Sequence, residues 1–398
     1  MIFVPPNRTM FCLAEQEAII VDRVRKHRVA QALSAVRALM AIRGVRGIVL
    51  TTPGAVAWAT GSMNPPVDRT AATDVVWLCV GPDRAVIVTT EVEAPRILAE
   101  FEPRSYGIEV VAVAWWDAAA VVSASERALD TGNNAPLGSD GHPAFSIDVT
   151  DDLTAARMPL GTEEQELLRS LGADATWAVQ QALRAWTPGE TDFDIQGRIS
   201  GLVESRGADC PVLLVGADDR IGKFRHPIAM GVPASRLVMA VLVARRAGLH
   251  VALTRYVSVG AIDQRLADGL SASRRIHRKM LAATVPGATY GSVLEVLEGA
   301  YRDEGHPDAW RQHYQGGPIG YAQREFEISP AQRDSRWWQQ LVSLGGAVAW
   351  NPSLPGGSKD EDTYLVGPEG AAERVTVAPE WPDSDDGTAR PGVLMLDG

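Results

Sequence analysis

The stretch RHPIAMGVPASRLVMAVLVARRAGLHVALTRYVSVG, from Arg225 to Gly260, decides the fold of this chain. Its apolar run Leu237–Val243 is too short for a core helix and is rich in β-branched residues, so it predicts a buried strand. After Gly248 the chain turns back, and residues 250–257 form a second segment with a strand pattern. Together the two segments predict a β-hairpin.

The facing positions of this hairpin determine what it can bind. If the hairpin is symmetric about Arg246 and Ala247, Val241 lies opposite Ala252. Directly opposed side chains have Cβ atoms about 4.5–5.5 Å apart, close enough for two carboxylates to hold metal ions between them. Valine and alanine offer no ligand atom, so we expect no metal at these two positions.

The stretch resembles the creatinase, prolidase and methionine aminopeptidase family, whose C-terminal domain has the pita-bread fold. That family has an Asp, ten residues, and a second Asp followed by x-Thr-Arg, and Thr254-Arg255 match its Thr-Arg. Downstream, Gly316–Gly320 matches Gly-His-Gly-x-Gly, Asn351-Pro352 matches Glu-Pro, and Gly357–Thr363 matches Gly-x-Arg-x-Glu-Asp-Thr. The resemblance implies that four of five metal-ligand positions have changed, to Val241, Ala252, Gly317 and Asn351, and that Glu361 remains.

One further family position is kept, a pocket histidine ahead of the first strand, which corresponds to His226. In creatinase, which works without metal, the histidine at this position is the proton-transfer residue, and the resemblance implies the same role for His226. Histidine titrates near neutral pH and can take a proton from water and return it to a leaving nitrogen, while Glu361 orients or charges a cationic group. We therefore expect His226 and Glu361 to be catalytic, and no metal or other cofactor to be needed.

Five other residues are candidates for substrate binding. In creatinase-like dimers a loop reaches into the partner's active site with a cation for the substrate carboxylate, and this resemblance implies Arg69, in the loop SMNPPVDRT. The other candidates are Arg255, of the Thr-Arg pair, and residues that flank the glycine-rich segment, namely His313, Arg324 and Glu325. Arg324 stands where many family members have a second histidine, and an arginine there favours an anionic group such as a carboxylate.

The N-terminal half alternates predicted strands and helices, which is typical of an α/β domain. Within it GIVLTTPGAVAWATG, residues 47–61, resembles the N-terminal domain of creatinase and prolidase. We predict a creatinase-like α/β domain over residues 1–158 and an α+β pita-bread domain over residues 159–398. The acidic stretch Pro379–Gly398 is expected to be a short tail after the fold.

Composition excludes several classes of partner. The net charge of −11 argues against nucleic-acid binding and against attraction to anionic membranes, and no segment has the pattern of a signal peptide or a transmembrane helix. The chain has an odd number of scattered cysteines, Cys12, Cys79 and Cys210, which indicates reduced thiols in the cytoplasm. We expect Cys79 and Cys210 to be buried. We expect a cytoplasmic homodimer with a small-molecule substrate.

Several functions fit these observations. The preferred one is a metal-independent, creatinase-type hydrolase that cleaves a C–N bond of a small amidine, guanidine or amino-acid-like substrate. The alternatives are a metal-free lyase, cyclase or isomerase of a biosynthetic pathway, and an inactive pseudo-peptidase that serves as a binding module. An Xaa-Pro metallopeptidase ranks last, because its ligand set is missing.

Overall fold

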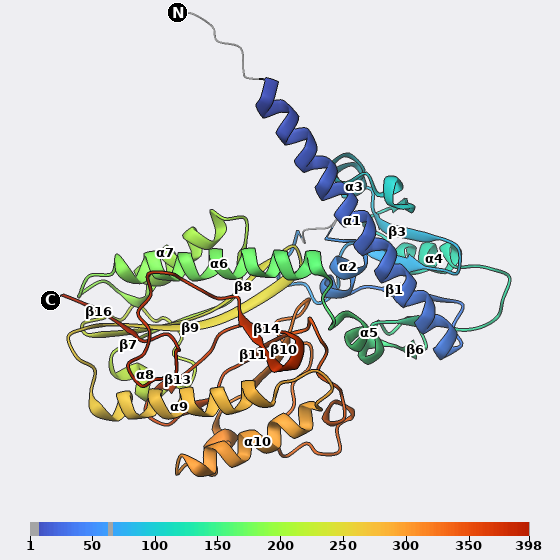
Figure 1. The fold of residues 1–398 in the computed structure, drawn as a ribbon. Helices are drawn as coiled ribbons and strands as arrows, with labels where there is room; N and C mark the ends of the chain where they lie inside the picture. The colour runs from blue at the N-terminus through green and yellow to red at the C-terminus, as the bar shows by residue number, and fades with distance from the viewer. Residues whose placement is uncertain (1–7, 63–66, 398) are drawn as a thin grey trace, which may run out of the picture. The chain divides into compact units, whose positions relative to one another are not determined.

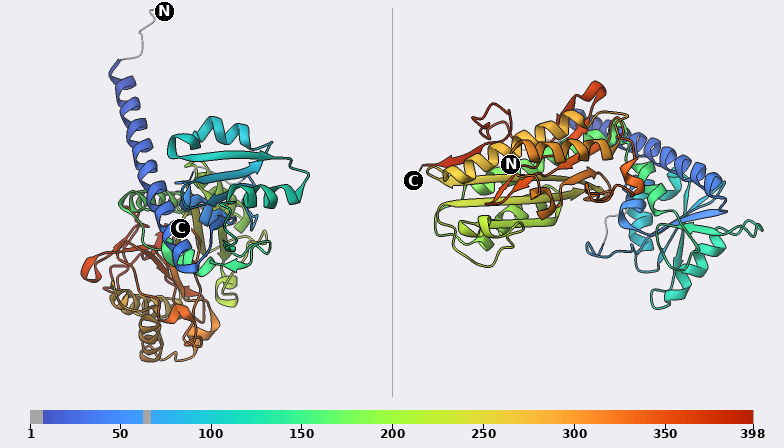
Figure 2. Two further views of the ribbon diagram at one scale, coloured as in Figure 1. Left: turned by 90° about the vertical axis from the view of Figure 1, so that its right-hand side faces the viewer. Right: turned by 90° about the horizontal axis from the view of Figure 1, so that it is seen from below.

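The computed structural model describes residues 8–62 and 67–397 of the chain. The chain divides into two compact units, Met1–Arg157 and Met158–Gly398. Figures 1 and 2 show the helices and strands that make up each unit. In the part of the chain that the structure describes, no helix combines the length and apolar character needed to cross a membrane.

Unit 1 is built on a mixed sheet, whose strands in the described residues follow the order β4-β3-β2-β1-β5-β6. Apolar side chains of β1, β2 and β3 pack against α4 and form the core of the unit, in which Cys79 is buried. The helices are α1 (Arg8–Arg43), α2 (Pro53–Ala59), α3 (Ala94–Phe101), α4 (Ala118–Ala128) and α5 (Thr150–Arg157). The strands are β1 (Gly47–Leu50), β2 (Trp77–Val80), β3 (Ala85–Thr90), β4 (Ile108–Val113), β5 (Leu137–Ser139) and β6 (Ile147–Asp148).

Unit 2 contains three sheets in its described residues, with strand orders β16-β9-β8-β7, β10-β11-β14-β15 and β12-β13. The first comprises β7 (Asp209–Ala217), β8 (Leu237–Arg246), β9 (Leu249–Val259) and β16 (Val393–Leu396). The second comprises β10 (Gly316–Ile319), β11 (Ala347–Trp350), β14 (Tyr364–Val366) and β15 (Ala372–Arg374). The short pair is β12 (Ser353–Leu354) and β13 (Ser358–Lys359).

The helices of unit 2 cover these sheets, with α6 against β8 and β9 and α7 against β7. Figure 1 shows α9 and α10 on the side of the unit away from α6 and α7. A second core lies between α9, α10 and the β10–β14 sheet, and includes Ile276, Leu294, Tyr301 and Trp350. The helices are α6 (Thr162–Arg184), α7 (Asp192–Glu204), α8 (Asp219–Lys223), α9 (Gln264–Ala283) and α10 (Tyr290–Asp303).

The β8–β9 hairpin is present, but the predicted register is wrong by two residues, because the turn is centred one residue later than predicted. Arg246 pairs with Leu249, so Val241 faces Thr254 and Val243 faces Ala252. The turn consists of Ala247 and Gly248, with φ values of 52° and 80°. A two-residue turn of this kind needs positive φ at both positions and matches the twist of the flanking strands, which centres the hairpin one residue later than expected.

The C-terminal stretch is part of the fold, so the prediction of a tail is wrong. β16 pairs in parallel with β9, from Val393 opposite Tyr256 to Leu396 opposite Val259. Arg390 has a side chain only 4% exposed and lies in a buried polar network of unit 2. The acidic, Pro-containing composition of Pro379–Gly398 is typical of a tail, and one short strand and one buried arginine within it are not evident from composition alone.

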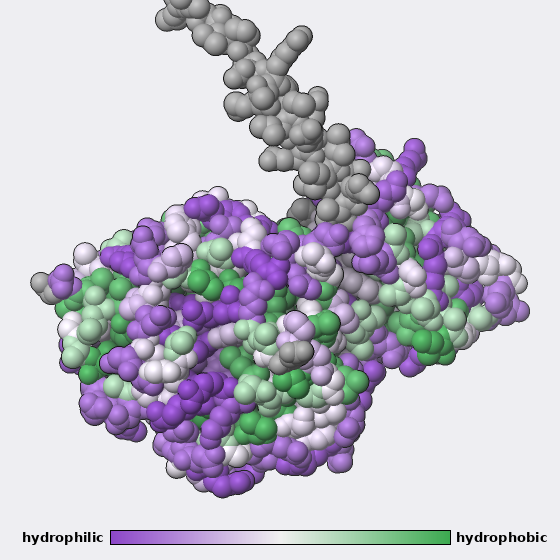
Figure 3. Space-filling model, viewed as in Figure 1, coloured by the Kyte–Doolittle hydropathy of each residue, from purple (hydrophilic) through white to green (hydrophobic). Residues whose placement is uncertain are grey.

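Two observations bear on the remaining composition-based predictions. On the face shown in Figure 3, hydrophilic and hydrophobic residues are interspersed within each unit. Cys79 is buried as expected, whereas Cys210 is half-buried. The side chain of Cys12 lies outside the described part of the structure.

Candidate functional site

A cavity of about 400 Å³ lies within unit 2, next to the β8–β9 hairpin. One wall is apolar and comes mainly from β7 and β8, whose side chains alternate between the two faces of the sheet. The opposite residues come from loops around β10, β11 and β13 and are polar or charged. The lining residues are Val212, Leu214, His226, Ile228, Val241, Val243, His313, Tyr314, Gln323, Arg324, Glu327, Asn351, Lys359 and Glu361.

Glu361 is the buried acid of this cavity, with a side chain 2% exposed. Its Oε2 accepts a hydrogen bond from Thr254 Oγ1 at 2.8 Å and lies 3.1 Å from Lys359 Nζ. Its Oε1 accepts from Asn351 Nδ2 at 3.2 Å and from Arg324 Nη2 at 3.3 Å. Each carboxylate oxygen therefore contacts one cation and one neutral donor of the protein itself.

The charge of Glu361 is stabilised by these neighbours. Burial raises its pKa, but Lys359 and Arg324, together with the hydrogen bond from Thr254, outweigh burial and lower the pKa to about 2. Burial in turn lowers the pKa of Lys359, an effect that Glu361 opposes. At neutral pH Glu361 is thus an ionised carboxylate, and its two oxygens lie next to the basic side chains of Lys359 and Arg324.

His226 and His313 form a pair at the same cavity. Their Nε2 atoms are 3.1 Å apart, and the His226 ring also stacks on Tyr314, with ring centroids 6.4 Å apart. His226 is exposed in the loop between α8 and β8, whereas His313 is half-buried directly after a 3₁₀ turn, Ala309–Gln312. Burial and the charge of Lys359 lower the pKa of both rings, that of His313 to about 3.

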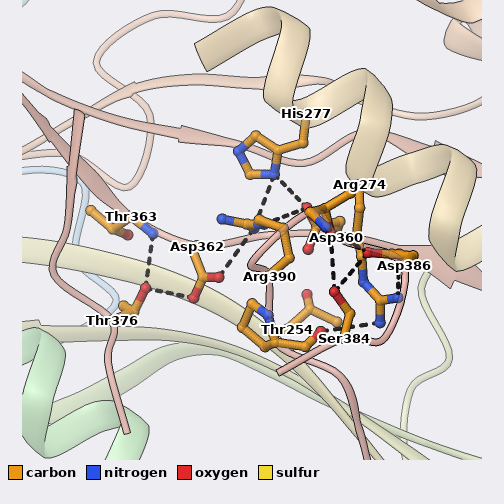
Figure 4. A network of polar contacts seen from close by, with 12 residues as sticks. Thr254, Arg274, His277, Asp360, Asp362, Thr363, Thr376, Ser384, Asp386 and Arg390 are labelled. Atoms are coloured by element: carbon orange, nitrogen blue, oxygen red, sulfur yellow. Dashed lines mark hydrogen bonds and ion pairs between the residues drawn. The ribbon is translucent and has the colours of Figure 1, made fainter. Parts of the chain in front are cut away.

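Behind Glu361 lies a second polar network, which Figure 4 shows from close by. Asp360 and Asp362 flank Glu361 in sequence and turn away from the cavity, as neighbours in an extended chain do. Asp362 Oδ1 lies 2.7 Å from Arg255 Nη2, and Asp360 Oδ2 lies 2.9 Å from Arg390 Nε and 2.8 Å from a ring nitrogen of His277. This network fixes the segment that presents Glu361 and Lys359.

The structure brings four of the predicted site residues together at the cavity: His226, His313, Arg324 and Glu361. Two others are not among its lining residues. Arg255 is 2% exposed and engaged by Asp362, and Glu325 is buried, with Oε1 accepting from the backbone of Ala322 at 3.1 Å. Arg69 is exposed in unit 1, beside residues 63–66, which lie outside the described part.

Lys359 and Asn351 are site residues that the sequence did not suggest. Lys359 precedes Glu361 by two residues, and in extended chain this spacing places both side chains on the same side. That spacing was a usable signal. The family resemblance marks Asn351 only as a changed metal-ligand position, whereas in the structure its amide donates to Glu361.

The residues present do not fit the pair of metal ions that the fold family implies. A metal site needs several oxygen or nitrogen ligands converging on one point, and no group of three or more His, Cys, Asp or Glu side chains within residues 8–62 and 67–397 is arranged to hold an ion. Both oxygens of Glu361 already face Lys359 and Arg324, whose charges would repel a cation.

Comparison with solved structures identifies the fold. The dipeptidase PepE from Mycobacterium ulcerans matches with a TM-score of 0.73 and 21% identity, over 93% of this chain and 99% of that one. The prolidase from Pyrococcus horikoshii matches with a TM-score of 0.70 and 16% identity, over 87% and 98%. The predicted creatinase/prolidase-type fold, with its two domains, is therefore confirmed.

The same fold also occurs in a different context. The N-terminal domain of a FACT complex subunit from chickpea, Cicer arietinum, matches with a TM-score of 0.65 and 10% identity, over 89% of this chain and 96% of that one. No family model matches the chain, and no curated protein matches it either. Since the fold is shared by proteins of different kinds, the argument for function has to come from the site.

Proposed function

We propose that this chain is a metal-independent hydrolase that cleaves a C–N bond of a small amidine, guanidine or amino-acid-like substrate. The observation that supports it is the His226–His313 pair at a cavity whose carboxylate is already neutralised by Lys359 and Arg324. The cavity then offers a base and fixed positive charge in place of a metal-bound water. The proposal includes a cytoplasmic homodimer, in which the loop with Arg69 would reach the cavity of a second copy.

The hydrogen bonds of the His226–His313 pair determine which ring nitrogen can act as the general base. His313 Nδ1 contacts the carbonyl oxygen of Tyr314, and a carbonyl can only accept, so Nδ1 of His313 carries the proton. The neutral His313 ring therefore accepts at Nε2, and His226 donates from its own Nε2. This arrangement leaves the lone pair of His226 on Nδ1, where it can take a proton.

The reaction requires one proton acceptor that later becomes a donor. His226 takes a proton from water as the water oxygen bonds to the trigonal carbon of the substrate, and the π electron pair of that carbon moves to its oxygen or second nitrogen. This pair re-forms the double bond as the C–N bond breaks, and the nitrogen leaves with the proton from His226, which returns the ring to its neutral form. In this proposal Glu361 acts as a positioning residue, because its two oxygens hold Lys359 and Arg324.

The pH dependence follows from the lowered pKa of His226. A base must be unprotonated to act, so activity falls as the pH drops through its pKa. Burial and the nearby Lys359 lower that pKa from the ordinary value of 6.5. We expect the acid limb of kcat/KM to have its midpoint below pH 6.5, and a midpoint above 6.5 would contradict this assignment.

The proposal can be tested on protein that has been treated with a chelator and checked for metal by plasma mass spectrometry. Such protein is incubated with a panel of amidines, guanidines and N-acyl amino acids, and release of ammonia or amine is measured. We expect turnover without metal, and expect one oxygen from ¹⁸O-labelled water in the product, which a lyase or cyclase would not incorporate. Turnover that appears only after manganese, zinc or cobalt is added would overturn metal independence, and no turnover under any condition would favour the binding module.

A further inference from the structure

We propose that Lys359 and Arg324 form an anion site that binds the carboxylate of a small aliphatic substrate, in the part of the fold where the family would hold metal ions. This inference deepens the proposed function and rests on it for the identity of the bound molecule as a substrate. The binding itself does not require any catalytic step.

Lys359 has more hydrogen-bond donors than the protein satisfies. Its side chain is 6% exposed, and its ammonium contacts Glu361 Oε2 at 3.1 Å, the one acceptor that the described residues offer it. An ammonium group carries three N–H donors. A donor that is shielded from bulk water is stabilised by an acceptor within reach. A ligand oxygen in the cavity can accept from the donors of Lys359 that Glu361 does not engage.

Arg324 provides the second cation, held by the opposite oxygen of the same carboxylate. Its Nη2 lies 3.3 Å from Glu361 Oε1, and its Nη1 donates to the carbonyl of Gln323 at 2.7 Å. A guanidinium has five N–H donors, and these are its two acceptors among the described residues. Since Lys359 and Arg324 approach one carboxylate from both oxygens, a ligand carboxylate can bridge the two in the same way.

The charges around this position favour an anion. Glu361 carries one negative charge against the two positive charges of Lys359 and Arg324. The other acid in the lining, Glu327, is exposed, so that solvent screens its charge more than that of the buried Glu361. His226 and His313 add no charge at neutral pH, because their pKa values are lowered. Among the lining side chains that are shielded from solvent, two basic groups, Lys359 and Arg324, therefore face one acid, Glu361.

The remaining wall indicates what accompanies the carboxylate. Aliphatic side chains of Val212, Leu214, Ile228, Val241 and Val243 line the same cavity. A cavity of about 400 Å³ is at the small end of ligand pockets. An acid with a short aliphatic or cyclic aliphatic body would match both the charge and the apolar wall.

Isothermal titration with two probes that differ in charge tests this site. The probes are 4-methylpentanoate and its uncharged counterpart 4-methylpentanamide. Charge-assisted hydrogen bonds contribute about 1.5–3 kcal/mol, so we expect the acid to bind roughly 10- to 100-fold more tightly than the amide. Lys359→Met should remove that preference and Lys359→Arg should retain most of it.

Two further variants make the result decisive. Lys223→Met removes an exposed lysine that faces Asp219 at 3.6 Å, and it should leave the preference for the acid unchanged. If Lys359→Met does not fold, as judged by circular dichroism, Arg324→Met gives the same test at a side chain that is 18% exposed.

The titration also separates this inference from the proposed function. Equal binding of acid and amide by the wild type, or an unchanged preference in Lys359→Met, would overturn the anion site and leave metal-free hydrolysis standing. A clear preference for the acid in a protein that shows no turnover would support the anion site while the proposed reaction fails.

Discussion

His226→Ala will lower kcat/KM by about 10²- to 10⁴-fold, the usual contribution of a general acid–base group, with little change in substrate affinity. The reason is the role of Nδ1, which the hydrogen bond to His313 leaves free to exchange a proton with water and with the leaving nitrogen. The measurement is steady-state release of ammonia or amine from whichever substrate the panel identifies. Titration of the product should confirm that binding is intact.

The matched control is His306→Ala. His306 is exposed in the loop after α10 and is not among the residues that line the cavity. We expect it to retain wild-type turnover. A His226→Ala protein with unchanged kcat/KM would remove this residue from the mechanism, whereas a loss that appeared equally in His306→Ala would indicate a general effect of histidine removal.

Much of the fold could be predicted from local patterns alone. β3 spans Ala85–Thr90 and begins after the turn Gly81-Pro82-Asp83, because proline and glycine restrict or permit backbone angles within a few residues of themselves. The β8–β9 hairpin was also visible from its apolar pattern. Its register was not, since a shift of the turn centre by one residue depends on whether Ala247 adopts a positive φ.

The site was harder to predict because its geometry depends on segments far apart in sequence. Glu361 could be identified from its motif, but its partners Thr254, Arg324 and Asn351 come from three other segments. The sequence shows which residue types are present, but it does not show which oxygen of the Glu361 carboxylate each of these side chains will contact. The predicted orientation of a cationic substrate by Glu361 did not take account of Lys359, which is close enough to neutralise that charge itself.

Arg255 is a second example of a contact that could not be predicted from the sequence. It was predicted to bind substrate because it belongs to a family motif in the hairpin. In the structure its guanidinium is buried, and besides Asp362 it contacts the carbonyl of Thr376 at 3.0 Å. A residue of a family motif can thus have a structural role, because buried charge has to be paired wherever it occurs.

The second large effect concerns this buried pair. Asp362→Ala will lower the free energy of unfolding by about 3–5 kcal/mol, the range observed when one partner of a buried ion pair is removed. Asp362 is fully buried, and its oxygens lie 2.7 Å from Arg255 Nη2 and 3.1 Å from Arg390 Nη2. Without it Arg255 keeps only backbone acceptors in the described network, while Arg390 retains Asp360. Urea unfolding followed by circular dichroism measures the change.

Glu295→Ala is the control, because Glu295 also pairs with an arginine in unit 2 but at the surface. It lies 2.9 Å from Arg333, with side chains 57% and 51% exposed, and exposed pairs contribute about 0–1 kcal/mol. A comparably small loss in Asp362→Ala would mean that water or backbone groups replace the carboxylate. The larger loss would show that the network in Figure 4 stabilises the segment that presents Lys359 and Glu361 to the cavity.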